Sequence, residues 1–222
     1  MFDLHTHSIF SDGELIPAES ARRACNVGYK GIAITDHGDT SNLVWILERQ
    51  LYFKEAFNKL SLNFKIIIGV ELTHVLPEEI EKLTLKARES GADIVLVHGE
   101  TIVEPVAKGT NRAAIDACVD ILAHPGLISD EDAKLAASNS VSLEISTRNG
   151  HSYTNAHVTL KAREFGAKLV VNNDFHSPGD NLSIELIRKV LKGAGLKESE
   201  VKDVFKNNET IFLKKLGGHI VK

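Results

Sequence analysis

The stretch Asp3-Leu4-His5-Thr6-His7-Ser8 stands close to the start of this 222-residue chain and has the pattern of a short strand that ends in two histidines. Alternate residues of a strand point to the same side, so His5 and His7 should project together. Two imidazoles on one face at a strand end can form half of a metal site. The motif gains weight only if later strands also end in metal ligands.

Strand-like apolar runs alternate with helical patterns along the whole chain, which is typical of βα units and a parallel sheet. In three units a glycine ends a helix and a buried strand follows within a few residues. These units are Gly28 before residues 31–35, Gly91 before residues 94–97, and Gly166 before residues 169–171. The sequence therefore predicts an α/β fold, and its length suits one barrel-type domain over residues 1–222.

Several elements have clear boundaries in the sequence. A first helix should begin near Pro17 and end at Gly28, and residues 41–60 have the pattern of the longest helix. Ser129 with Asp132 looks like a capping box that opens the helix after the fifth strand. From residue 199 to residue 222 a short charged helix is combined with an apolar piece. We expect this last segment to pack on the outside of the barrel.

The composition narrows the classes of function. Hydrophobic residues make up 43% and charged residues 25%, as in an ordinary soluble globular protein, and no apolar run reaches the length of a membrane span. The formal net charge of -4 provides no basic surface for nucleic acid. Cys25 and Cys118 fall in predicted helices, where reduced core thiols are expected. These features predict a cytoplasmic protein without a membrane partner.

Metal-capable side chains recur where predicted strands end. Besides His5 and His7, they are Asp12 after strand one, His37 after strand two, Glu71 on strand three, His98 on strand four, His124 on strand five, and Asp174 and His176 after strand seven. The carboxyl ends of parallel strands are where barrel active sites are built. Buried polar groups are costly without partners, and shared metal ions would satisfy all of them together. Nine nitrogen and oxygen ligands exceed the four of a single zinc ion, so we predict two or three ions of zinc, manganese or iron.

The order of these motifs resembles that of the PHP family, named for polymerase and histidinol phosphatase. The similarity runs from Asp3 to about His176, which is most of the chain. It implies a distorted, seven-stranded, TIM-like β/α barrel with a di- or trinuclear metal site. It also implies an enzyme that hydrolyses phosphoric esters with a metal-activated hydroxide.

The resemblance further implies how the ligands divide among three metal positions. The first would be held by His5, His7, Glu71 and Asp174, the second by the bridging Glu71 with His98 and His124, and the third by Asp12, His37 and His176. Of these residues, Glu71, Asp174 and His176 are the implied catalytic residues.

Three further residues are candidates for substrate binding. Arg148 follows strand six, which runs from Val141 to Ile145 and supplies no metal ligand, so its guanidinium could hold a phosphate group. Arg112 follows strand four, and His151 could also approach the substrate. The alternative interpretation for the two arginines is a solvated loop position.

Hydrolysis of a small phosphomonoester, as in a histidinol phosphatase, is the leading hypothesis. A phosphodiesterase or nuclease could use the same metals on nucleic acid or nucleotides. A third hypothesis is a non-catalytic subunit of a larger assembly, although the complete ligand set argues against it. Amidohydrolases also begin with the H-x-H pattern on a barrel, but they usually place a bridging lysine where this chain has His98.

Overall fold

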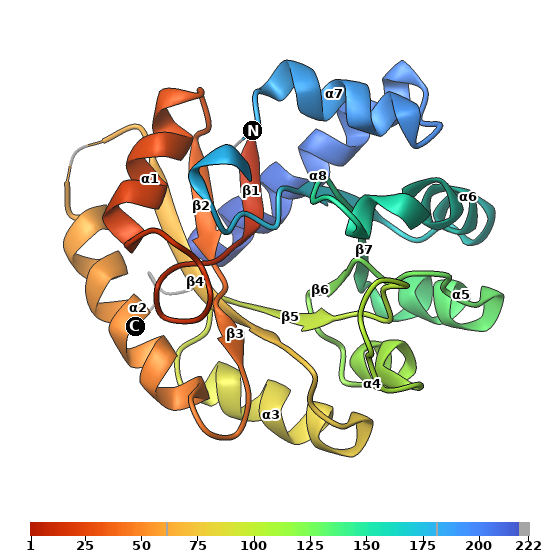
Figure 1. Cartoon of the computed structure of the whole chain (residues 1–222), viewed down its shortest axis with the longest axis horizontal. Helices are drawn as coiled ribbons and strands as arrows, with labels where there is room; N and C mark the ends of the chain where they lie inside the picture. The colour runs from red at the N-terminus through yellow and green to blue at the C-terminus, as the bar shows by residue number, and fades with distance from the viewer. Residues whose placement is uncertain (61, 181, 218–222) are drawn as a thin grey trace.

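The computed structural model describes residues 1–60, 62–180 and 182–217. Its parallel sheet has the order β1-β2-β4-β5-β6-β7-β8, and a short β3 pairs with β4 beside this path. The strands are β1 (Phe2–Thr6), β2 (Gly31–Ile34), β3 (His37–Gly38), β4 (Lys65–Leu72), β5 (Ile94–His98), β6 (Ile121–Ala123), β7 (Ser142–Ser146) and β8 (Leu169–Asn172). The strands curve into a nearly closed barrel (Figure 1), which confirms the predicted distorted seven-stranded α/β barrel.

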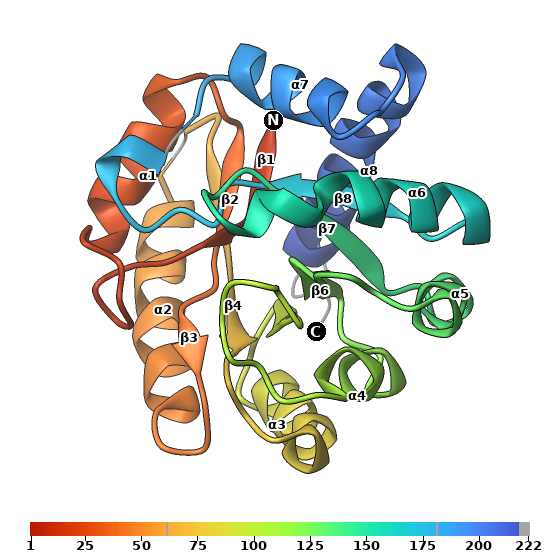
Figure 2. The same cartoon turned by 45° about the vertical axis from the view of Figure 1, so that its right-hand side comes forward.

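Helices surround this barrel on its outer side (Figures 1 and 2). They are α1 (Pro17–Asn26), α2 (Leu43–Asn58), α3 (Pro77–Glu89), α4 (Thr110–Asp116), α5 (Asp130–Asn139), α6 (Asn155–Phe165), α7 (Ile184–Gly193) and α8 (Glu198–Gly217). α1 and α3 each begin with a proline, as the sequence indicated for α1. The Ser129 hydroxyl accepts a hydrogen bond from the backbone N–H of Asp132, which confirms the predicted cap of α5. Among the described helices, none is long and apolar enough to cross a membrane.

The ring of strands closes between β1 and β8, at their carboxyl ends. Thr6 and Phe175 form an isolated parallel bridge, and the backbone N–H of His7 donates to the carbonyl oxygen of Phe175 over 2.8 Å. Two residues before Thr6, the backbone N–H of Leu4 donates a hydrogen bond to the side-chain oxygen of Asn172, also at 2.8 Å. The two histidines of the opening motif are thereby brought beside the segment that follows β8.

The barrel interior changes from apolar to polar along the strands. The lower layer, on the side away from the carboxyl ends of the strands, consists of buried side chains that pack on one another: Leu4, Ala33, Ile67, Ile94, Leu96, Ile121, Val170 and Phe212. Residues two or four positions further along the same strands face the same side. On β4 this period leads from Ile67 to Glu71, and on β5 from Leu96 to His98. The polar upper layer is therefore a direct continuation of the hydrophobic core.

Gly69 lies between these two layers on β4, where neighbouring backbones approach closely. A Cβ atom at this position would lie 2.0 Å from the carbonyl oxygen of Ile94. Only glycine allows β4 and β5 to pack at this distance. The close approach holds β4 against β5 in the register that pairs Glu71 with Leu96, two residues before His98.

The C-terminal segment differs in form from the sequence-based expectation. The predicted apolar piece 211–213 belongs to the continuous helix α8, whose buried residues Val201, Val204, Asn208 and Phe212 follow helical spacing. α8 lies behind the strands in Figure 1, and Phe212 fills the lower layer of the barrel interior. Residues 218–222, the remainder of the segment that was expected to pack on the outside, are not among the described residues.

Both cysteines contradict their predicted burial. Cys25 and Cys118 are exposed thiols. Cys25 lies in the last turn of α1, on the side that faces away from the strands, and Cys118 follows the end of α4 with a positive φ of 52°. The short β3 at His37 was also not predicted, because two residues between polar neighbours carry no periodic signal.

Candidate metal centre

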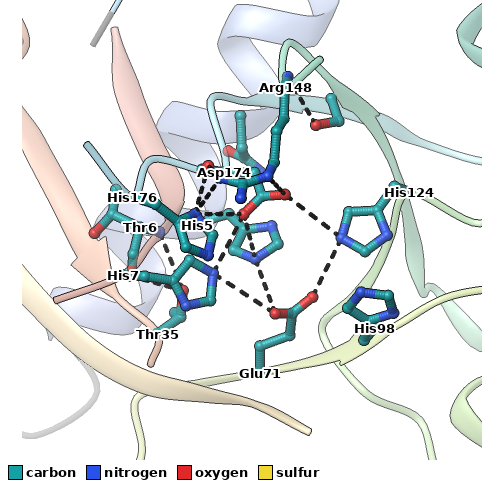
Figure 3. A network of polar contacts seen from close by, with 12 residues as sticks. His5, Thr6, His7, Thr35, Glu71, His98, His124, Arg148, Asp174 and His176 are labelled. Carbon is teal, nitrogen blue, oxygen red and sulfur yellow. Dashed lines mark hydrogen bonds and ion pairs between the residues drawn. The ribbon is translucent and has the colours of Figure 1, made fainter. Parts of the chain in front are cut away.

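Glu71 and Asp174 face each other across the upper end of the barrel (Figure 3). The Nε2 atom of His5 lies 3.3 Å from Oε2 of Glu71 and 3.6 Å from Oδ1 of Asp174. The Nε2 atom of His7 lies 3.6 Å and 3.3 Å from the same two oxygens. On the other side, Nε2 of His124 lies 3.4 Å from Oε1 of Glu71. The two carboxylates thus stand at the centre of a ring of imidazoles.

A second group of ligand atoms lies toward the β1 loop. The Nε2 atoms of His37 and His176 lie 3.4 Å and 3.2 Å from Oδ1 of Asp12. The ring of His7 is close to both histidines, with ring centroids 4.1 Å apart in each case. One potential ligand atom from each of His7, Asp12, His37 and His176 falls within 4.8 Å of the others.

A third group lies toward β5, β6 and the loop after β7. His98, His124 and His151 are buried and place ligand atoms within 4.8 Å of one another. The rings of His124 and His151 stack with their centroids 4.0 Å apart, and the ring of His98 stands at 4.4 Å from that of His124. The cavity beside these groups has a volume of about 210 Å³ and is lined by Asp12, His37, Thr73, His74, His98, Glu104, Arg148, His151, Asp174 and His176.

Two of these side chains reach the centre because the backbone turns sharply where a strand ends. His124 has a φ of 25° and Asp174 a φ of 52°, both in the left-handed region that non-glycine residues rarely adopt. Such a conformation costs on the order of 1–3 kcal/mol and is concentrated at functional sites. The strain rotates each side chain toward Glu71, where a simple continuation of the strand would not place it.

Fixed hydrogen bonds orient the histidine rings. The Nδ1 atom of His98 lies 3.2 Å from the carbonyl oxygen of Gly99, which can only accept, so Nδ1 carries a proton. Nδ1 of His5 lies 2.9 Å from Oε1 of the buried Glu144. In metal-binding histidines one ring nitrogen is usually held by an acceptor in this way, which orients the other toward the metal.

Glu144→Gln is expected to weaken metal binding. Glu144 accepts from Nδ1 of His5, from the Asn172 side chain at 2.7 Å and from the backbone N–H of His124 at 3.1 Å, so an amide NH₂ group would oppose one of these donors. Loss of such an orienting partner typically lowers metal affinity about 10–100-fold. Chelator competition measures the change, with Ser142→Ala on the same strand as the control. Unchanged affinity would mean that Glu144 does not orient His5.

Several buried polar atoms at the centre have no hydrogen-bond partner. Within the described part of the chain, they include Nε2 of His5, both ring nitrogens of His7, Oε1 of Glu71, Nδ1 of His124 and Oδ1 of Asp174. Leaving such atoms unsatisfied costs about 1–3 kcal/mol each. Imidazole nitrogens and carboxylate oxygens that face one another at 3.3–3.7 Å without hydrogen-bond geometry fit shared cations. The residues present therefore fit more than one metal ion.

The negative charges of Glu71 and Asp174 also fit the binding of metal ions at this centre. Burial by itself would raise the pKa of Glu71, but the neighbouring His5 and His37 outweigh it and lower this pKa well below the usual range. Burial likewise opposes the charged form of His37, whereas the Glu71 carboxylate favours it and raises the pKa of His37 to about 10. Glu71 and Asp174 are therefore ionised and hold buried negative charge that divalent cations can neutralise.

The structure brings two of the three predicted substrate-binding residues to the cavity. Arg148 donates from Nη1 to the carbonyl oxygen of Asp174 at 3.1 Å and approaches Nδ1 of His176 at 2.5 Å. His151 lies in the third ligand group, where Nδ1 is 2.9 Å from the Thr101 hydroxyl. Arg112 is not brought to this cavity: its exposed guanidinium pairs with Asp132 of α5.

Sequence reasoning missed two acidic residues of the site. Glu144 stands in the middle of β7, the strand that was predicted to supply no metal ligand, although a glutamate in a buried strand is itself a signal of a paired charge. Glu104 lies in the loop between β5 and α4, and its Oε2 is 3.1 Å from Nε2 of His98. A loop has no periodic pattern, so its position could not be predicted from the sequence.

The sequence of this chain is similar to those of known proteins. The model of the PHP domain matches residues 3–98. The chain is 47% identical to the uncharacterized protein MJ1295 of Methanocaldococcus jannaschii, covering 97% of this chain and 99% of that protein. It is 29% identical to a probable phosphatase of Thermoanaerobacter sp. (strain X514), with 98% of each chain covered. The chain belongs to the PHP family.

Two solved structures share the fold. One is a histidinol phosphate phosphatase from Lactococcus lactis complexed with zinc, L-histidinol and phosphate, with a TM-score of 0.63, 21% identity, and coverage of 88% of this chain and 94% of that one. The other is a chain of an archaeal ribonuclease P in complex with mature tRNA, with a TM-score of 0.73, 17% identity, and coverage of 99% and 94%. At these identities the likeness concerns the fold alone.

Proposed function

We propose that this protein is a metal-dependent phosphoesterase that hydrolyses a small phosphomonoester. The observation that carries the proposal is the set of unpartnered buried nitrogen and oxygen atoms around Glu71 and Asp174, beside a cavity that also holds a guanidinium. The full-length similarity to a probable phosphatase and the fold shared with a histidinol phosphate phosphatase support the same substrate class.

The three ligand groups suggest three metal positions. His5 and His7 with Glu71 and Asp174 would hold the first ion, and Glu71 would bridge to a second ion at His98 and His124. Asp12, His37 and His176 would hold a third. When bound, such ions lower the pKa of a coordinated water and neutralise charge on phosphoryl oxygens.

The other residues of the cavity have roles of their own in this proposal. Arg148 is 31% exposed and tethered to the Asp174 carbonyl, so its remaining N–H groups can bind a phosphate oxygen at the cavity mouth. Glu144 fixes the ring of His5, and Thr101 that of His151. The cavity of about 210 Å³ has room for a phosphate group.

Hydrolysis of a phosphodiester in nucleic acid is the second candidate function. The observation that favours it is the high fold similarity to a chain of an archaeal ribonuclease P bound to tRNA. The net charge of -4 argues for the smaller substrate, because nucleic-acid backbones are usually bound by basic surfaces. A non-catalytic role is the least supported, since every predicted ligand position carries a capable side chain.

Metal analysis and an assay panel test this proposal together. Protein purified without chelator should contain two to three ions per chain by elemental analysis, because the candidate ligands form several groups and exceed the four of a single zinc ion. The metal-loaded protein should hydrolyse p-nitrophenyl phosphate faster than bis-p-nitrophenyl phosphate, single-stranded RNA or an amide. One ion or none would contradict the multinuclear site. Turnover of only the diester or RNA would establish the second candidate function instead.

A further inference from the structure

The loop between β5 and α4 places a carboxylate over one edge of the metal centre. Glu104 lies near the middle of this loop, and its two oxygens contact three imidazoles. Oε2 lies 3.1 Å from Nε2 of His98 and 3.3 Å from Nε2 of His74, and Oε1 lies 3.4 Å from Nε2 of His151. Glu104 and Arg148 both line the cavity of the metal centre.

The metal position beside Glu104 has more candidate ligands than the proposed assignment uses. Glu71, His98 and His124 were assigned to it, yet His151 adds a third buried imidazole to the group. Together with Glu104 these residues would exceed the four ligands typical of zinc and leave no coordination position for a water or substrate oxygen. A catalytic zinc ion needs an open position, so one of the five residues would have to leave if all of them bind it.

Glu104 differs from the other members of the group in its exposure. Its side chain is 37% exposed, whereas those of His98, His124 and His151 are at most 5% exposed. The loop is tied at both ends by Glu100, whose Oε1 accepts from the N–H groups of Gly109 and Asn111 at 3.1 and 2.9 Å. The tip that carries Glu104 can therefore shift without releasing the loop from the barrel.

We propose that Glu104 is a displaceable metal ligand: it closes the metal position at His98, His124 and His151 in the free protein and yields to a phosphate oxygen when substrate binds. This rests on the metal centre of the proposed function. A carboxylate and a phosphate are both hard oxygen anions, so they compete for the same cation. The exposed His74, 43% accessible, already contacts Oε2 of Glu104 at 3.3 Å and would keep this contact after Glu104 leaves the metal.

The test compares Glu104→Gln with the wild-type protein in two binding measurements. Chelator competition should show that one ion of the set is bound about 10–100-fold more weakly, because a neutral amide is a poor metal ligand. Calorimetry with inorganic phosphate at saturating zinc should show the opposite, a dissociation constant about tenfold lower, because the competing anion is gone. Glu55→Gln removes the same charge from an exposed position on α2 and should change neither value.

A second variant separates coordination from simple charge. Glu104→Asp keeps the negative charge but withdraws the carboxylate by one methylene, so it should lose metal affinity nearly as Glu104→Gln does. If metal and phosphate affinities of Glu104→Gln equal those of the wild type, Glu104 is not a ligand. If Glu104→Gln binds both metal and phosphate more weakly, Glu104 is a permanent ligand that phosphate does not displace. Either result leaves the proposed function standing, which fails only if the wild-type protein itself lacks metal or turnover.

Discussion

Replacing Glu71 with alanine should remove about two metal ions from each chain and abolish turnover. Glu71 is fully buried, and its two oxygens face His5 on one side and His124 on the other at 3.3 and 3.4 Å. A carboxylate shared by two positions cannot be lost from only one of them. Losing metal stabilisation of several kcal/mol lowers the rate about a thousandfold or more. Elemental analysis and steady-state kinetics on a phosphomonoester measure the two effects.

Glu71→Gln is the matched variant, since it keeps the volume of the side chain and removes only its charge. It should show the same joint loss of metal and activity, while circular dichroism shows an intact fold. Full turnover in either variant would refute the bridging role. Loss of a single ion with the second retained would assign Glu71 to one metal position only.

Arg148→Ala should weaken substrate binding and leave the metal content unchanged. The guanidinium of Arg148 lines the cavity and donates to the carbonyl oxygen of Asp174, but it cannot coordinate a cation. Losing a charge-assisted contact to phosphate costs about 1.5–3 kcal/mol, or roughly tenfold to a hundredfold in affinity. Kinetics beside a metal assay measure the effect, which should fall mainly on KM.

Two further variants sharpen this experiment. Arg148→Lys keeps the charge but not the planar pair of donors, so it should recover only part of the lost affinity. Arg112→Ala removes an arginine that pairs with Asp132 on the surface, and it should leave KM unaltered. If Arg112→Ala raises KM and Arg148→Ala does not, the roles of the two arginines are reversed. A joint loss of metal and activity in Arg148→Ala would mean that the loop after β7 shapes the metal centre.

The positions that follow strand periodicity could be predicted from the sequence. Glu71 and His98 continue the inward faces of β4 and β5, and apolar residues two and four positions earlier show which side is inward. On β1, His5 and His7 do not continue the side of the interior residue Leu4, and they were predicted from the H-x-H motif itself. The barrel itself follows from the regular alternation of helical and strand patterns, because parallel strands need a crossover helix at each step.

The positions that depend on loops and on distant packing could not be predicted. The contacts of Glu104 depend on the path of a loop. Asp174 was predicted as a ligand from its place after a strand, but the backbone turn at a φ of 52° that directs it to the centre was not. The exposed position of Cys25 depends on which face of α1 packs on the barrel, and small residues such as Ala21 and Ala24 mark that face only weakly. Helix α8 was divided wrongly because one polar residue, Asn208, interrupts its apolar stripe.

The same Asn208 links the two ends of the chain. Its side-chain amide donates to the carbonyl oxygens of Phe2 on β1 and Val171 on β8, at 3.0 and 2.8 Å, and the first of these bonds joins residues 206 positions apart. Contacts of such long range form late, since the intervening chain must be ordered first. During synthesis, β1 therefore gains its contact with Asn208 only after α8 has left the ribosome. β1 also pairs directly with the segment after β8 through Thr6 and Phe175, so Asn208 of α8 adds a third connection where the ring of strands closes.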